Sequence, residues 1–271
     1  MDQHRHGYMM ESEEESVRLD LKTDPGAVEK QALWAGIQPG MRVADLGCGS
    51  GKTTFVLNNL TGPSGTTIGI DIAPQRIGYA ESHYSHAGIE YACKDIRKPL
   101  TDLGLFDFVW VRFVLEYYRR DSIDIVKNIS TILKPGGILC LIDLDCNCLR
   151  HHGLSRRLEK YISELMKILE KEFNFDPYAG IKLYSYLYDL GFQDIAVDVT
   201  AHNIIYGELK EVDSFNWTKK VEMAAKNSGC RFPDYEDGYE GFFKEFREFF
   251  TDFRRFTYNP LISCRGVKPL S

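Results

Sequence analysis

The segment VADLGCGSGKTT, residues 43–54, combines a carboxylate with closely spaced glycines. Glycines at this spacing let the backbone turn sharply and lie directly against a ligand, as nucleotide-binding loops do. The end of the segment, Gly51-Lys52-Thr53, also matches the end of a phosphate-binding P-loop. The segment therefore points to one of two ligands: a nucleoside, or a nucleotide bound through its phosphates.

Two departures from the phosphate-binding patterns favour the nucleoside. A P-loop requires a glycine where this chain has Leu46, and the dinucleotide fingerprint G-x-G-x-x-G fails at Lys52. Asp45 comes just before the loop, where a carboxylate would repel phosphates but attract a cation or hydroxyl groups. Lys52 and Thr53 are then interpreted as the solvated first turn of a helix, and Cys48 as a small packing residue.

Two more carboxylates stand at the ends of the next two predicted strands. Asp71 follows Asp45 by 71 − 45 = 26 residues, and Asp95 ends the strand after that. The carboxyl ends of parallel strands form the edge at which open α/β sheets bind ligands, and an acid about 20 residues after the loop commonly meets a ribose. Each acid alone could cap a turn. Together with the loop, they predict a nucleoside site without a pyrophosphate.

The elements that must position these residues alternate regularly. Strands are predicted at 41–47, 66–72, 89–96, 106–113 and 138–145, with helices between them at 52–60, 74–88 and 121–137. This alternation predicts βαβ units and a parallel sheet with helices on both faces. One helix or two, broken near Asp24-Pro25-Gly26, should precede the first strand.

The pattern changes after Asp145. Helices are predicted at 154–174, 178–190, 208–228 and 235–256, and strands at 191–200 and 261–268. Phenylalanines between 242 and 256 recur at the i, i+3, i+4, i+7 spacing of an amphipathic helix. Core packing is the default explanation for them. An apolar acceptor pocket is the alternative, and the same choice applies to Trp217, Phe173, Phe175 and Tyr178.

Over residues 30–145 the chain resembles the class I S-adenosylmethionine-dependent methyltransferases. The similarity lies in VADLGCGSG, IGIDIAPQRI, CKDI and FDFVWVRFVLEY, followed by LKPGGILCLID. It is strongest to the small-molecule branch that includes the ubiquinone and menaquinone C-methyltransferases. The resemblance implies an α/β fold, Rossmann-like and doubly wound, with a mostly parallel seven-stranded sheet and an added helical lid.

The resemblance also implies S-adenosyl-L-methionine as the cofactor, and it gives each motif residue a role. The methionine end would be held by the backbones of Gly47, Cys48, Gly49 and Arg112, by Asp45 near its ammonium, and by Tyr8 closing over it. The nucleoside end would be held by Asp71 on the ribose hydroxyls, by Ile72 and Arg76 beside the adenine, and by Asp95 and Ile96 at the adenine amino group. Arg76 departs from the Met or Leu usual there, although a guanidinium can stack on a ring.

The resulting interpretation divides the chain into three parts. Residues 1–36 cover the cofactor site, 37–147 form the cofactor-binding core, and 148–271 complete the sheet and supply a helical cap. The function implied is methyl transfer to a small, apolar or aromatic acceptor that enters between residues 145–152 and the helices beyond 208. The candidates for a catalytic base are His151 and Tyr117, with His152 and Glu116 behind them.

Two other functions remain open: a P-loop NTPase, and a non-enzymatic cofactor sensor or partner-binding protein with a methyltransferase-like fold. The formal net charge of −6 over 271 residues disfavours nucleic acid as a partner. Seven cysteines, an odd number, favour a reducing cytoplasm, and no apolar run reaches the length of a membrane span.

Cys146-x-Cys148 with His151 and His152 could ligate a soft metal or metalloid, but structural zinc usually has C-x₂-C spacing, so no metal is expected. The sequence leaves open the acceptor, the atom that is methylated, and whether the protein is a monomer or a homodimer.

Overall fold

Eight strands form a single sheet in the computed structural model, which describes residues 15–270. The strands are β1 (Arg42–Leu46), β2 (Thr66–Asp71), β3 (Ile89–Cys93), β4 (Phe106–Arg112), β5 (Leu133–Leu144), β6 (His151–His152), β7 (Gln193–Tyr206) and β8 (Phe256–Val267). The α-helices are α1 (Glu15–Lys22), α2 (Pro25–Ala35), α3 (Lys52–Thr61), α4 (Pro74–Tyr84), α5 (Ser122–Ser130), α6 (Arg156–Glu172), α7 (Ala179–Asp189), α8 (Glu211–Ser228) and α9 (Tyr239–Thr251). Two short 3-10 helices, η1 (Thr101–Leu103) and η2 (Leu115–Tyr117), flank β4.

The sheet begins with five parallel strands in the order β3-β2-β1-β4-β5. β8 then pairs antiparallel with β5, and β7 pairs antiparallel with the other edge of β8. The two-residue β6 pairs with the start of β8, beyond the part of β8 that meets β5. The predicted α/β, doubly wound and mostly parallel fold is confirmed, with β6 as a short addition to the seven strands expected.

Alternate residues of the central strands pack on opposite faces of the sheet, as the two-residue period of a strand requires. On β4, Val109 and Val111 join the core formed with α5 and α7, whereas Phe108 and Trp110 join the core formed with α2 and α3. Both faces are therefore covered by helices, which explains why these strands read as nearly continuous apolar runs.

The helix predicted over 121–137 ends earlier than expected, at Ser130. The chain then re-enters the sheet, because the Phe106 amide donates to the Ile132 carbonyl and Leu133 pairs with Phe106. Pro135-Gly136-Gly137 thus lies inside β5, where the register with β4 shifts, rather than ending the helix.

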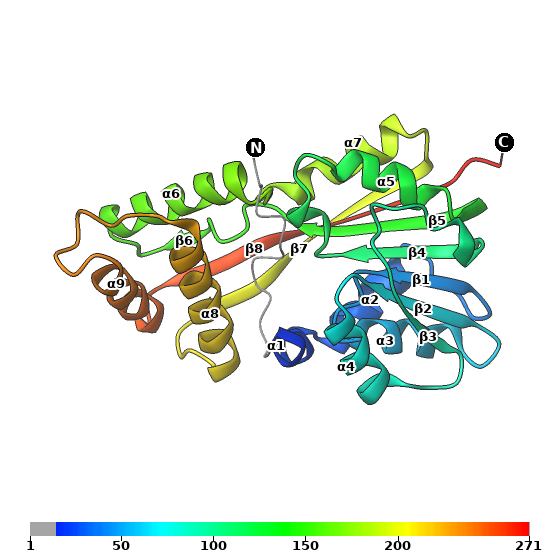
Figure 1. The fold of residues 1–271 in the computed structure, drawn as a ribbon, viewed down its shortest axis with the longest axis horizontal. Coiled ribbons are helices and arrows are strands. Elements are labelled where there is room, and N and C mark those ends of the chain that lie inside the picture. The colour runs from blue at the N-terminus through cyan, green and yellow to red at the C-terminus, as the bar shows by residue number, and fades with distance from the viewer. Residues whose placement is uncertain (1–14, 271) are drawn as a thin grey trace.

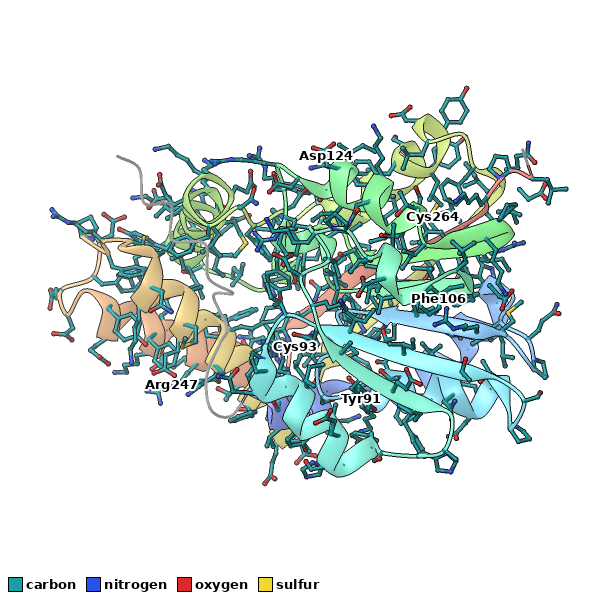
Figure 2. The ribbon with its side chains drawn as sticks, turned by 45° about the vertical axis from the view of Figure 1, so that its right-hand side comes forward. Tyr91, Cys93, Phe106, Asp124, Arg247 and Cys264 are labelled. Carbon is teal, nitrogen blue, oxygen red and sulfur yellow. The ribbon has the colours of Figure 1, made fainter. Side chains whose placement is uncertain are left out.

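A second lobe extends beyond the core at one end of the molecule (Figure 1). It consists of α6, α8 and α9, gathered around the far ends of β7 and β8, which are long enough to run from the core into it. Figure 2 marks the lobe by Arg247 on α9 and the core by Phe106 and Cys264. α1 packs against both α4 of the core and α8 of the lobe. None of the helices within residues 15–270 is long and apolar enough to cross a membrane.

Candidate functional site

The glycine loop after β1 has a backbone conformation that residues other than glycine rarely adopt. Gly47 has a φ of +81°, and a Cβ added to it would overlap the Val114 side chain. Gly49 has a φ of +56°, and its amide donates to the Asp71 carboxylate at 3.0 Å. A positive φ is open mainly to glycine, so the loop is fixed by these residues in a shape that presses against the segment after β4.

Asp45, near the end of β1, is buried beneath this loop. Its carboxylate accepts one hydrogen bond, from the Thr54 hydroxyl at 2.7 Å, and forms no ion pair with a described residue. Burial raises the pKa of the Asp45 carboxyl to about 7, and repulsion from Asp71 adds to the increase, while Thr54 and Arg112 oppose it. A cation placed beside this carboxylate would stabilise its charged form.

Asp71 ends β2 and is bound by groups from both sides. One oxygen accepts from the Gly49 amide, and the other accepts from the Ala73 amide at 3.0 Å and from Arg76 Nε at 2.9 Å. Asp71 and Arg76 are both buried, so they form a buried ion pair next to the glycine loop. Arg76 was predicted to flank an adenine; its guanidinium pairs with Asp71, the acid predicted to bind the ribose, and both roles stay predictions.

Asp95 differs from the other two acids. Its carboxylate is bound by Arg97, through Nε at 2.9 Å and a terminal nitrogen at 2.8 Å, and this pairing lowers its pKa. The neighbours Ile96 and Arg97 line the cavity described next, but Asp95 does not. Its role at an adenine amino group stays a prediction.

A cavity of about 260 Å³ opens from the glycine loop toward α1 and the end of α6. Ten of the predicted site residues line it: Asp45, Gly47, Cys48, Gly49, Asp71, Ile72, Arg76, Ile96, Arg112 and Tyr117. Its opposite side is formed by Arg18, Leu19, Lys22 and Thr23 of the α1 segment and by Glu172, Phe173, Asn174 and Phe175. Tyr8 lies outside the described residues.

The sequence predicted that residues 1–36 cover the cofactor site, but it did not identify Arg18, Leu19 and Lys22 as the residues that line the cavity. Arg18 and Lys22 are four residues apart, and Leu19 lies between them, so one face of a short helix presents all three. That spacing was the available signal. The segment before it, residues 1–16, is polar and acidic, and this composition obscured the signal.

His151 lies in the aromatic core of the second lobe and does not line this cavity. Its ring packs edge-on against Trp217 and Phe249, with centroids 5.2 and 5.7 Å away. One ring nitrogen is 2.8 Å from the Thr257 hydroxyl and the other is 3.1 Å from the Cys148 carbonyl oxygen. Burial lowers the pKa of His151 to about 4, so the ring is neutral at pH 7. The geometry gives its predicted role as a base no support, whereas Tyr117 faces the cavity.

The phenylalanine-rich helix α9 also turns away from the cavity. Phe242, Phe246 and Phe250 are buried together with Trp217 of α8 in the core of the lobe. No residue of 208–256 lines the 260 Å³ cavity, so core packing accounts for the phenylalanine stripe. The space available to an acceptor lies beside α1 and Phe173–Phe175 instead.

Among residues 15–270, no three His, Cys, Asp or Glu side chains are grouped as metal ligands.

Lys52, the P-loop candidate, has a structural contact. Its ammonium donates to the Asp20 carbonyl oxygen at 2.8 Å, and the Tyr84 hydroxyl donates to the Asp20 carboxylate. Lys52 therefore ties α1 to the start of α3 and does not point at a phosphate cradle. The P-loop alternative has no support.

Comparisons with known proteins agree with this geometry. A family model described as a methyltransferase domain matches residues 44–141, which include the glycine loop and all three acids. Residues 44–141 form a methyltransferase domain, similar to those of the class I S-adenosylmethionine-dependent methyltransferases. S-adenosylmethionine is the cofactor of such domains.

Two curated methyltransferases illustrate the similarity. The demethylmenaquinone methyltransferase of Lactococcus lactis subsp. lactis is 29% identical over 49% of this chain and 53% of its own length. The ubiquinone/menaquinone biosynthesis C-methyltransferase of Pseudomonas syringae pv. tomato is 26% identical over 71% of this chain and 82% of its own. The chain spans about half the length of the first curated relatives that it matches.

Solved structures extend the fold similarity over most of the chain. The crystal structure of a methyltransferase candidate from Bacillus halodurans C-125 has a TM-score of 0.57, at 16% identity over 90% of this chain and 99% of that one. The methyltransferase fold thus includes the second half of the sheet, beyond the matched domain.

The residues present fit the cofactor. Gly47, Cys48 and Gly49 line the cavity, so the loop backbone can meet a ligand there. The buried Asp45 carboxylate carries no ion pair with a described residue, which suits a ligand ammonium. Asp71 lines the same cavity and suits ribose hydroxyls.

Proposed function

We propose that this protein transfers a methyl group from S-adenosylmethionine to a small acceptor with an apolar or aromatic body. This proposal rests on one observation: a single cavity is lined both by the predicted cofactor-binding residues and by aromatic side chains. The cofactor residues Asp45 and Asp71 face the same space as the aromatic side chains of Tyr117, Phe173 and Phe175. Pockets for small ligands are lined mainly by such side chains, with a few polar groups that set orientation.

The relatives support an aromatic acceptor. One is named for demethylmenaquinone and another for ubiquinone and menaquinone biosynthesis. The Tyr117 ring lies 5.8 Å from that of Phe175, so two rings from separate segments form one wall against which a flat acceptor would pack.

When bound, S-adenosylmethionine supplies an electrophilic methyl group on a positively charged sulfur. In the proposed reaction the protein's contribution is orientation and the exclusion of water. Asp45 would hold the ammonium, the backbone of Gly47–Gly49 would lie along the methionine part, and Asp71 would hold the ribose. Arg76 would hold the Asp71 carboxylate in place through their buried ion pair.

Two side chains would close the acceptor end. Leu19 of α1 approaches the loop closely enough that a Cβ on Gly49 would lie 3.1 Å from its Cδ1. Phe173 covers the cavity from the end of α6. Tyr117 is the candidate to hydrogen-bond the acceptor atom that loses a proton. In this proposal residues 1–36 and the end of α6 form the cover of a core at 37–147, and the rest of 148–271 completes the sheet.

Calorimetry with S-adenosylhomocysteine, compared with ATP and magnesium, tests the cofactor assignment. We expect the first to bind and the second not to bind. A panel of reduced quinones and phenols, with labelled S-adenosylmethionine, then tests transfer, and Tyr117→Phe should lower the rate without changing S-adenosylhomocysteine affinity. Cofactor binding without transfer to any small molecule would favour the alternative of a non-enzymatic cofactor sensor.

A further inference from the structure

Two cations line the cavity around one aromatic ring. The ammonium of Lys22, from α1, lies 4.7 Å from the centroid of the Phe113 ring. The guanidinium of Arg112, at the end of β4, lies 4.2 Å from the same centroid. Both residues belong to the cavity lining, so the Phe113 ring brings together positive charges from two distant parts of the sequence.

Among the described residues, these two cations form no ion pair with a carboxylate, unlike most other cations of the cavity lining. Elsewhere in the lining, Arg76 pairs with Asp71, Arg97 with Asp95 and Lys94 with Asp102. Within residues 15–270, Arg112 donates only to the neutral Gln31 amide oxygen, at 3.2 Å, and the Lys22 ammonium has no hydrogen-bond acceptor. Both side chains are partly buried, and a partly buried charge without an ion-pair partner is costly, so a ligand anion would be favoured here.

A third cation, from the second lobe, lies near Lys22. Lys220 of α8 lies with Lys22 around a small hollow next to the main cavity. The His202 ring packs on Phe113 with centroids 5.2 Å apart, and its buried Nε2 has no hydrogen-bond partner among the described residues. Burial lowers the pKa of His202, and the positive charges of Lys22, Arg112 and Lys220 lower it further, so this ring lies within the influence of all three cations.

The cofactor alone does not neutralise this group. Its ammonium would face Asp45, its sulfonium adds another positive charge, and its one carboxylate can neutralise one cation. Asp45, Asp143 and Asp24 attract Arg112, and Glu116 attracts Lys22, but none of these acids forms an ion pair with either cation among the described residues. At least one of Lys22 and Arg112 is then left without an ion-pair partner. Lys220 lies behind Lys22, in a hollow that Asp213 also lines.

We propose that the acceptor carries an anionic group, a carboxylate or a phosphate, that binds Lys22 with Lys220 behind it. The inference rests on the proposed methyl transfer and gives it a substrate class: a small acceptor with an aromatic or apolar body and one anionic substituent. The body lies against Tyr117 and Phe175, and the anion points toward Phe113. The pKa of Lys22 agrees, since burial, Lys220, Arg18 and Arg112 lower it to about 7 while Glu116 opposes them.

The test uses the full chain saturated with S-adenosylhomocysteine and matched pairs of probes: benzoate against benzamide, 1-naphthoate against 1-naphthamide, and phenyl phosphate against phenol. We expect the anion of at least one pair to bind at least about tenfold more tightly than its neutral partner by calorimetry. Lys22→Met should remove that preference. Lys30→Met is the control, since Lys30 is exposed on α2 outside the cavity.

Each outcome separates the two proposals. If S-adenosylhomocysteine does not bind the wild-type protein, the proposed function and this inference both fail. If it binds but no anion exceeds its neutral partner, only the anionic class of acceptor is overturned. If Lys22→Met weakens S-adenosylhomocysteine as much as it weakens the anion, the lysine serves the cofactor carboxylate, and this inference is again overturned. Tighter binding of phenyl phosphate than of either carboxylate would assign the anion as a phosphate.

Discussion

The glycine loop of the core and the aromatic stripe of α9 are both strong local sequence patterns, but only one of them faces the cavity. Gly47 and Gly49 need a backbone conformation that other residues adopt at a cost, so their presence signals a ligand. The phenylalanines of α9 need only burial, and Trp217 and α6 already provide it. Closely spaced glycines that follow a strand-end acid therefore pointed to the cavity, whereas the apolar stripe pointed only to a buried face.

The largest expected effect on stability and on cofactor affinity is in the core, at the buried ion pair of Asp71 and Arg76. Asp71→Ala would leave the Arg76 guanidinium buried without its carboxylate, which should lower the free energy of unfolding by about 3–5 kcal/mol. S-adenosylhomocysteine should also lose affinity by roughly 1.5–3 kcal/mol per hydrogen bond lost. Denaturant unfolding and calorimetry measure the two effects.

Asp95→Ala is the matched control, because the Arg97 partner is 40% exposed and such pairs contribute about 0–1 kcal/mol. The double variant Asp71→Ala/Arg76→Met should recover stability but not cofactor affinity. Equal stability losses in the two single aspartate variants would contradict the distinction between these acids.

A comparable change in the second lobe should affect stability alone. Phe246 is fully buried in the aromatic core, and Phe246→Ala should lower the free energy of unfolding by about 3–5 kcal/mol through the cavity that it leaves. S-adenosylhomocysteine affinity, measured well below the melting temperature, should be unchanged. A tenfold loss of affinity in the folded variant would show that the lobe takes part in the site.

Gly47→Ala should have a smaller effect on stability. The left-handed backbone costs about 1–2 kcal/mol, and the overlap with Val114 adds about 1–3 kcal/mol. Gly191→Ala is the control, because Gly191 has a φ of +75° with open space around it and should show only the first cost. Cofactor affinity should fall in the Gly47 variant and stay unchanged in the Gly191 variant, as calorimetry would show.

The smallest expected effect is that of pH on the affinity for S-adenosylhomocysteine. The pKa of Asp45 is raised to about 7, so below that pH the carboxyl is neutral and must lose its proton to meet the cofactor ammonium. Affinity for S-adenosylhomocysteine should therefore rise with pH by up to about tenfold per unit below pH 7 and level off above it. Asp45→Asn should bind weakly with a flat profile between pH 5.5 and 7. An equally steep profile in that variant would assign the titration to another group.

The core could be predicted from the sequence because local patterns fix it. The strand-to-glycine transition at Asp45–Gly47 and the strand-end position of Asp71 follow from short windows of sequence. The Asp71–Arg76 pair could not be predicted, since it depends on how a helical side chain folds back onto a strand end. The position of Lys22 depends on the docking of α1 against α4 and α8, which are distant in sequence.

The arrangement of the second lobe could not be predicted from local patterns either, because it depends on residues that are far apart in the sequence. β7 and β8 continue past the core because they pair with each other as far as Tyr206 and Phe256, and this pairing is set by long-range register. His151 illustrates the consequence. Its place beside the fifth strand suggested a base, whereas β6 pairs it with β8 inside the aromatic core.

The bonds from Lys52 and Tyr84 to Asp20 have a kinetic consequence. They fasten α1 beside the cavity, so a molecule bound there would be enclosed by Arg18, Leu19 and Lys22. The dwell time of the spent cofactor would then be set by how often this latch opens, and not by the strength of its own contacts. Two proteins with identical cavities but different latches would bind the same molecule equally tightly and still turn over at different rates.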